Sequence, residues 1–218
     1  DVLHYQLDIQ FPLNSGYLSG KMRITSLCNQ PSLNNISLHC AALTVDTVRR
    51  EGIPLPYSLT NDMLDITLDQ SFTDGDTIRL EIDYHGTKAY QGYYFWTKNI
   101  PSSIYENIGY TMSEPSDARH WMPCYDQPDD KATCEINATV PMGYLAASNG
   151  LLIATVDNGN GTQTFHWRET HPVATYLMCV TMSRYSTFSD TYTRVTNPTQ
   201  NVEIKYYMWQ EDSAAART

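Results

Sequence analysis

Apolar residues recur at every second position through most of this chain, and that spacing limits what the chain can fold into. The N-terminal run places Leu3, Tyr5, Leu7, Ile9 and Phe11 between polar residues. A period of two is typical of a strand that buries one face, whereas a surface helix repeats its apolar residues every three or four positions. We therefore predict that the chain begins with a half-buried strand.

Similar alternation predicts further strands at residues 18–27, 36–40, 64–68, 78–84, 134–140, 151–157 and 201–209. The stretches "TDGDT" (73–77) and "DNGNGT" (157–162) contain glycines that are free to take positive φ, so each predicts a hairpin turn. The short apolar run "YLMCVTM" (176–182) predicts a strand buried on both faces. No amphipathic pattern of three helical turns occurs before residue 210. The predicted fold is therefore all-β, with antiparallel hairpins and more than one packed sheet.

Composition narrows the function classes. An apolar fraction of 41% over 218 residues is enough for a buried core. The formal net charge of −10 argues against a nucleic-acid-binding surface, which needs a basic face. No run approaches the roughly 20 apolar residues that a membrane-spanning helix needs. The Tyr- and Asn-rich, Lys-poor composition favours export only slightly over a cytoplasmic location.

No metal or nucleophile motif stands out. HExxH, P-loop, GxSxG and Rossmann glycine patterns are all missing from the sequence. None of the five cysteines forms a CxxC pair, which argues against a structural zinc site, while a Cys124–Cys134 disulfide stays open. His166, Glu169 and His171 are close in sequence, but the two histidines are expected on opposite faces of a strand, so we expect packing or surface roles for them.

The end of the chain has a different pattern. "QEDSAAART" (210–218) offers Asp212 or Ser213 as a helix N-cap, followed by three alanines. A helix needs about a dozen residues to be stable alone. We therefore expect residues 1–210 to form the β domain, and residues 211–218 to begin a linker or the first helix of a following domain.

The stretch "TMSEPSDARHWMPCYDQPDDKATCE" (111–135) breaks the alternation with a dense run of charged and turn-forming residues. It resembles a segment of the N-terminal domain of M1 zinc aminopeptidases, in which a Gln or Glu is followed by "DAR", "PC-x-D-x-P" and "KA". The matching residues are Glu114, Asp117-Ala118-Arg119, Pro123-Cys124, Asp126, Pro128 and Lys131-Ala132.

Other stretches extend this resemblance over essentially the whole chain. "LHYQLDIQF" with "GYLSGKMRITSL" resembles the opening hairpin of that domain, and "YQGYYF" a stretch that follows a later hairpin. "HPVATYLMCVTMSRY" and "VEIKYYMW" resemble its closing strands. The resemblance implies a saddle-shaped, multi-sheet antiparallel β domain that caps a catalytic domain and is inactive alone. The zinc would be bound by that catalytic domain, with no metal ligand and no catalytic residue in this chain.

The resemblance also implies roles for residues of the segment. Glu114 falls where the family has a Gln or Glu that binds the free α-amino group of a peptide substrate. A carboxylate suits that role because it makes charge-assisted hydrogen bonds with an ammonium group. The bond before Pro115 is expected to be cis, as in family members at this position. Asp117, Arg119 and Asp126 are expected to support the loop, and which carboxylate pairs with Arg119 stays open.

Neighbouring aromatic residues suggest packing roles. Trp121 and Met122 are expected to anchor the segment in the core. For Tyr93, Tyr94, Phe95 and Trp96, cross-strand packing is favoured over a substrate-lining role. The implied partners are the N-terminus of a peptide substrate and the chain's own catalytic domain. A non-catalytic M1-like scaffold that binds other proteins is the alternative function, distinguished by whether GxMEN and HExxH motifs follow.

Overall fold

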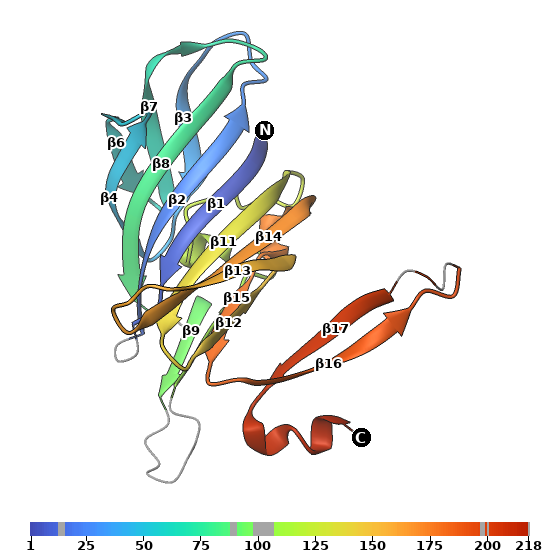
Figure 1. Ribbon diagram of the computed structural model, residues 1–218. Helices are drawn as coiled ribbons and strands as arrows, with labels where there is room; N and C mark the ends of the chain where they lie inside the picture. Colours follow the sequence, from blue (N-terminus) through green and yellow to red (C-terminus); the bar gives the residue numbers. More distant parts are fainter. Residues whose placement is uncertain (13–15, 88–90, 98–106, 197–198, 200, 218) are drawn as a thin grey trace.

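The computed structural model describes residues 1–12, 16–87, 91–97, 107–196, 199 and 201–217, and its regular structure is almost entirely β-strand (Figure 1). Tyr90 of "YQGYYF" lies outside the described residues. The large sheet has eight strands in the order β13 (Leu151–Asp157), β14 (Thr162–Ala174), β11 (Lys131–Pro141), β1 (Val2–Gln10), β2 (Tyr17–Leu27), β8 (Thr77–Thr87), β4 (Leu43–Arg50) and β5 (Ile53–Pro54).

Three smaller sheets complete the described fold. The small sheet has the order β3 (Leu33–His39), β7 (Met63–Phe72) and β6 (Tyr57–Thr60). A four-stranded sheet has the order β12 (Leu145–Ser148), β15 (Val180–Ser183), β10 (Asn107–Met112) and β9 (Gly92–Thr97). The ribbon, β16 (Ser186–Thr193) and β17 (Asn201–Met208), projects away from the other sheets in Figure 1. The predicted all-β class with several sheets is confirmed.

One pairing in the large sheet is parallel. The opening hairpin β1–β2 is antiparallel, as expected, but β1 also pairs with β11 in parallel register, with Tyr5 opposite Cys134. More than a hundred residues separate these two strands in the sequence, so no tight turn forces them to run in opposite directions.

In β1, burial follows the predicted alternation except at the start of the strand. Tyr5, Leu7 and Ile9 are buried, but Leu3 is 42% exposed and Val2 is buried in its place. The pairing of β1 with β2 shifts register between Val2 and His4. A β-bulge of this kind changes the face to which the preceding side chains point, so the expectation for Leu3 is wrong.

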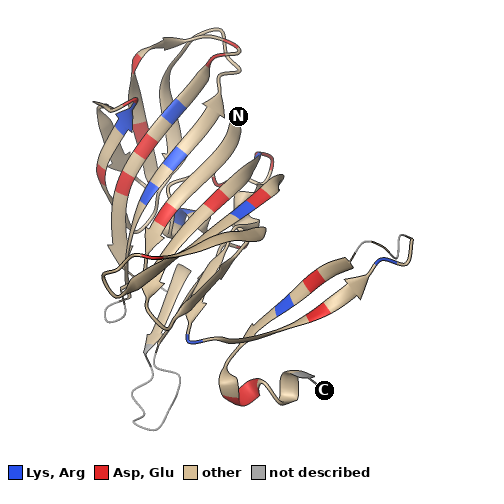
Figure 2. Cartoon of the chain, in the orientation of Figure 1, with Lys and Arg blue, Asp and Glu red and all other residues tan. Residues whose placement is uncertain are grey.

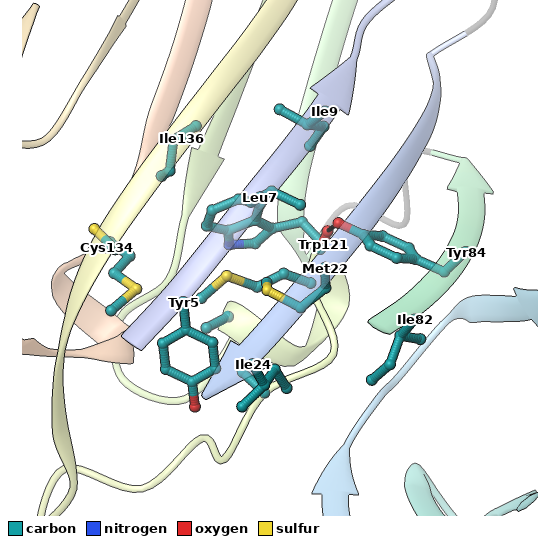
Figure 3. Packing of buried hydrophobic residues seen from close by; sticks show 14 of the residues in the cluster. Tyr5, Leu7, Ile9, Met22, Ile24, Ile82, Tyr84, Trp121, Cys134 and Ile136 are labelled. Atoms are coloured by element: carbon teal, nitrogen blue, oxygen red, sulfur yellow. Dashed lines mark hydrogen bonds between the residues drawn. The ribbon is translucent and has the colours of Figure 1, made fainter. Parts of the chain in front are cut away.

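The core lies on the inner face of the large sheet. Figure 3 shows side chains of β1, β2 and β8 gathered around Trp121, which is fully buried. Because protein interiors are close-packed, the indole fixes the spacing of the layers that contact it. The strands therefore form a rigid support for the loop that carries Trp121.

The predicted hairpin at "TDGDT" is wrong. Strand β7 pairs with β3 and β6, whereas β8 pairs with β2 and β4, so both edges of each strand are occupied by other partners. The turn is bound to the chain near Cys28, whose N–H donates to Asp76 O at 2.8 Å and whose carbonyl accepts from Gly75 N–H at 2.9 Å. It therefore carries the chain from the small sheet to the large one.

The outcome differs for two other stretches. "DNGNGT" joins the antiparallel pair β13–β14, so that hairpin is confirmed. For "YLMCVTM" the predicted strand is present only from Val180 onward, in β15 (Val180–Ser183), because the chain first makes a 3₁₀ turn η2 (Thr175–Leu177). Leu177 is 50% exposed. The apolar residues of this run therefore pack against the core on one side of the chain and not on both.

Near the end of the chain, residues 210–217 form two short 3₁₀ turns, η3 (Gln210–Asp212) and η4 (Ala215–Arg217), where we expected a helix to begin. In the described residues, no helix has the length and apolar content needed to cross a membrane.

The outer face of the large sheet is covered by alternating charges, visible in Figure 2 along β2, β8 and β4. Lys21 Nζ lies 2.7 Å from Glu81 Oε1 and 3.0 Å from Asp83 Oδ1, and Arg49 pairs with Asp83. Burial alone would raise the pKa of Asp83, but hydrogen bonds from Arg49, Thr47 and Lys21 outweigh it and lower the pKa to about 2. The carboxylate therefore stays ionised well into the acidic range.

We expect Asp83→Asn to lower the free energy of unfolding by about 1 kcal/mol at pH 7, because the network is partly solvated. The folded-state pKa lies below the ordinary value of 3.8, so this contribution is present above pH 4 and is lost as pH falls toward 2. Urea titrations of both forms between pH 7 and 2.5 measure it. Asp74→Asn, in the exposed turn after β7, is the control; a difference for Asp83→Asn that does not shrink with acidity would contradict the expectation.

Candidate functional site

The segment that breaks the strand pattern forms one long connection. Residues 113–130, called the cleft loop below, join the end of β10 in the four-stranded sheet to the start of β11 in the large sheet. They contain one 3₁₀ turn, η1 (Ala118–His120). The loop therefore links two sheets and crosses the core between them.

Buried side chains hold the cleft loop from inside. Trp121 and Met122 are at most 1% exposed, so the expectation that they anchor the segment is confirmed. Trp121 Nε1–H donates to Ser113 Oγ at 3.0 Å, and Ser113 Oγ–H donates to Met178 O at 2.7 Å. Tyr84 O–H donates to Trp121 O at 2.8 Å, a contact visible in Figure 3. The indole N–H and the backbone carbonyl of Trp121 are thus each held by a hydrogen bond, with Ser113 and with Tyr84 of β8.

Backbone hydrogen bonds hold the middle of the loop against the end of β3. His39 and Cys124 exchange two N–H to O bonds, at 2.8 and 3.1 Å. Asp126 N–H donates to His39 Nδ1 at 3.1 Å, so that ring nitrogen is unprotonated. Burial, and next the positive charge of Arg119, lower the pKa of His39. The neutral ring is therefore the form that the loop requires.

The pairing of Arg119 is resolved. Its Nε–H donates to Asp126 Oδ2 at 2.9 Å, and the Asp126 side chain is only 1% exposed. The other carboxylate oxygen accepts from Thr175 Oγ1 at 2.9 Å. Asp126 therefore joins the two legs of the cleft loop to each other and to the turn before β15.

Asp117 has a smaller part in these contacts. Its Oδ1 lies 3.5 Å from His120 Nδ1, and its backbone N–H donates to Ser113 O at 2.8 Å. Gly92, the first residue of β9, has a φ of +65°, and a Cβ placed on it would lie 2.2 Å from Asp117 O. The loop and β9 therefore approach so closely that only glycine fits at this point.

We expect Gly92→Ala to destabilise the fold by about 2 kcal/mol, because both the positive φ and the missing space oppose a methyl group. Urea unfolding of the variant measures the loss. Gly143 also has a positive φ, of +87°, but has open space around it. Gly143→Ala is therefore the matched control for the backbone effect alone. Equal losses for the two variants would mean that contact with the loop contributes nothing.

Glu114 and Pro115 lie at the exposed start of the cleft loop. The bond between them is cis, the isomer that the resemblance implies. In the described part of the chain, the Glu114 carboxylate makes no hydrogen bond or ion pair, although its neighbour Ser113 is only 3% exposed. A free carboxylate thus projects from a backbone that is fixed one residue away.

The aromatic residues near the loop mostly pack between strands. Tyr93 and Phe95 are buried, and Tyr94 stacks on its cross-strand partner Tyr110 with ring centroids 5.1 Å apart. Packing is therefore confirmed for these three. Trp96 is 56% exposed, so cross-strand packing accounts for little of its surface.

The cysteines and histidines form no recognisable reactive site. All five cysteines are free thiols, so the possible Cys124–Cys134 disulfide is not formed. His171 Nδ1 lies 3.0 Å from Glu169 Oε1, while His166 Nδ1 lies 2.7 Å from Asn137 Oδ1. Among the described residues, no three His, Cys, Asp or Glu side chains come together as a group that could hold a metal ion.

Sequence reasoning missed several residues that fix the cleft loop: Tyr5, His39, Tyr84, Ser113 and Thr175. They lie on different elements or connections, and each makes at least one hydrogen bond with a residue far from it in the sequence. No local pattern could have identified them. Only the glycine at position 92, directly before an aromatic run, gave a signal that the backbone there is unusual.

The comparisons with known proteins agree with one another. The family model for the peptidase M1 N-terminal domain matches residues 2–177. The chain is 24% identical over 183 residues to leucine aminopeptidase 2 of Vanderwaltozyma polyspora, covering 80% of this chain and 27% of that protein. It is 33% identical over 128 residues to glutamyl aminopeptidase of Rattus norvegicus, covering 56% and 13%.

Solved structures show the same likeness. The M1 zinc metallopeptidase from Deinococcus radiodurans superposes with a TM-score of 0.78 at 27% identity, over 94% of this chain and 46% of that one. A form of that enzyme bound to a Tyr-Ser-Ala substrate gives a TM-score of 0.79. The chain thus spans about a quarter or less of these two curated relatives and about half of these solved chains.

Proposed function

Because the chain belongs to the family of M1 peptidase N-terminal domains, we propose that it works as the N-terminal part of a zinc aminopeptidase, which removes residues from the amino end of peptides. Residues 1–210 would form the β domain, and residues 211–218 would lead toward the catalytic domain. In this division of labour the chain binds and positions substrate and is inactive alone.

Glu114 would bind the substrate's α-amino group. The observation that carries this role is the exposed Glu114 carboxylate, without a partner in the described chain, at the start of a loop fixed from inside by Ser113 and Trp121. An ammonium group has three N–H donors and no acceptor, so an unpaired carboxylate is a suitable receptor for it. Holding the amino terminus at one point would leave room for one residue before the bond to be cleaved.

The rest of the cleft loop would keep that carboxylate in place. Positioning groups must be held to within a fraction of an ångström for binding energy to assist a reaction. The Arg119–Asp126 pair and the contact with Gly92 fix the loop on either side of η1. These residues support Glu114 and need not touch substrate.

Zinc has no site in the described part of this chain, where no suitable group of ligands comes together. The metal would be held by the catalytic domain, and would there supply an activated water. The residues of this chain would only bind the peptide and exclude solvent above it.

The ribbon gives a surface on which a catalytic domain could pack. Cross-strand register places most of the apolar residues of the ribbon on one face, which also carries Ser186 and Asp190, while Tyr207 lies on the other face. The apolar face carries Phe188, Tyr192, Val202, Ile204, Tyr206 and Met208. Four of them, Tyr192, Val202, Ile204 and Tyr206, are 37–51% exposed. A two-stranded ribbon is marginal alone, so a covering domain would stabilise it.

The test is aminopeptidase activity of the full-length protein that carries this chain, on a panel of aminoacyl p-nitroanilides. We expect hydrolysis that stops with a chelator, returns with zinc, and fails on N-acetylated substrates. A zinc-loaded, folded protein that cleaves none of them would favour the scaffold function over the enzyme.

A further inference from the structure

A second binding surface lies away from Glu114, between the large sheet and the free edge of the small sheet. This edge groove has a volume of about 550 Å³, within the range typical of ligand sites. Its floor is formed by buried apolar side chains, each at most 6% exposed: Val2, Ile24, Leu38, Ile78 and Leu80. Strand β3 forms one wall, and Tyr125, Asp129 and Asp130 of the cleft loop form part of another.

The wall formed by β3 offers unpaired backbone groups. β3 is the edge strand of the small sheet, and His39 uses its N–H and C=O on the outer side, toward Cys124. Outward and inward bonding alternate along an antiparallel strand, so Ser37 and Asn35 point their backbone groups to the same outer side. The bond from Thr67 N–H to Pro56 O agrees, because Thr67 opposite Asn35 bonds away from it.

Among the described residues, no backbone group pairs with the outward N–H and C=O of Ser37 or Asn35. Cys124 forms an isolated antiparallel bridge with His39, and the bridge is not continued, because Asp126 N–H donates to the His39 ring rather than to a backbone carbonyl of β3. The groove therefore lies where a strand would be if the pairing of Cys124 with β3 were extended along β3.

The charged side chains that line the groove are all acidic. Its lining includes Asp1, Asp129 and Asp130 but no Lys, Arg or His. Asp130 accepts a hydrogen bond from Val2 N–H at 3.0 Å, whereas the Asp129 carboxylate has no partner in the described chain. A smaller groove of about 450 Å³ on the other face is lined by both signs of charge, including Arg23, Arg79, Glu51 and Glu81.

We propose that the edge groove binds an extended peptide segment of alternating apolar and basic residues, which adds as a strand to β3. The peptide backbone pairs with Asn35 and Ser37, as in other cases of strand addition. Its inward side chains follow the direction of Ile36 and Leu38 onto the apolar floor. Its basic side chains meet the carboxylates of Asp129 and Asp130. This site goes beyond the proposed aminopeptidase function and does not depend on it.

The test uses the full-length protein and a fluorescent peptide, acetyl-Val-Lys-Val-Lys-Val-Lys-amide, whose blocked terminus cannot serve as an aminopeptidase substrate. Fluorescence anisotropy should show saturable binding that weakens as salt rises. Asp129→Asn should raise Kd by about threefold to tenfold, in line with the loss of one charge-assisted contact. Ser37→Pro, which removes one outward N–H at an edge strand that tolerates proline, should raise Kd by at least about tenfold.

Matched controls establish that the peptide binds in the edge groove and pairs through its backbone. Asp212→Asn, at the far end of the chain, and Glu114→Ala, at the proposed aminopeptidase site, should leave Kd unchanged. A peptide of the same sequence with alternate amides N-methylated, or with Glu in place of Lys, should not bind. Equal binding of either peptide would overturn strand addition. So would equal displacement of the fluorescent peptide by phenethylamine, which has an apolar ring and an ammonium group but no peptide backbone. If Ser37→Pro unfolds at the same temperature as the unchanged protein, its loss of peptide binding is local and does not come from a disrupted fold.

Discussion

Replacing Glu114 by alanine in the full-length protein should lower kcat/KM for aminoacyl p-nitroanilides by about ten- to hundredfold, the effect of removing a hydrogen bond to a charged group. The side chain is exposed and has no partner in the described chain, so its removal should leave the fold unchanged. Steady-state kinetics with zinc-loaded protein measure the loss, and thermal unfolding checks that the variant is folded.

Glu114→Gln and Asp74→Ala are the informative controls. Gln keeps an acceptor for the substrate's ammonium but removes the charge, so we expect an intermediate loss. Asp74 lies in an exposed turn and should have no effect on either kinetic constant. If zinc-dependent activity is present and Glu114→Ala leaves kcat/KM unchanged, the family assignment stands and the assignment of Glu114 is wrong.

The strands were predictable because alternation reports burial of one face, which the sequence records residue by residue. Partner choice was not. The turn "TDGDT" has the chemistry of a hairpin, yet β7 and β8 belong to different sheets. A local turn limits only the direction of the chain, while pairing depends on which edges other strands have occupied. The parallel contact of β1 with β11 could not be read from either strand alone.

The position of the candidate site in the sequence was predictable, but the contacts that hold it together were not. The residues from Glu114 to Ala132 identified the loop, and Trp121 was recognisable as an anchor because a large aromatic residue within a charged run must be buried somewhere. The choice of Asp126 over Asp117 as the partner of Arg119 depends on how the chain folds back after Cys124. The hydrogen bond that Tyr5 accepts from Tyr125 N–H and the one that Tyr84 donates to Trp121 O connect residues 120 and 37 positions apart.

Asp126→Ala should be the most destabilising of these changes, with a loss of about 3 kcal/mol in the free energy of unfolding. The carboxylate is 1% exposed and accepts hydrogen bonds from Arg119 and Thr175, so its removal leaves both donors without their acceptor. We place the loss at the lower end of the range for broken buried pairs because the Arg119 side chain keeps 22% of its surface in water. The midpoint of thermal unfolding should fall by about 6–12 °C in a chain of this length.

Urea unfolding of the 218-residue chain, followed by tryptophan fluorescence, measures this loss. Asp126→Asn keeps an acceptor for Thr175 and should lose about half as much. Asp117→Ala removes a partly exposed carboxylate from the same loop, 3.5 Å from His120, and should lose no more than about 1 kcal/mol. The loop would then be held chiefly by its one buried ion pair, and Glu114 would owe its position to that pair. Equal losses for Asp126→Ala and Asp117→Ala would mean that the buried aromatic anchor, rather than the ion pair, fixes the loop.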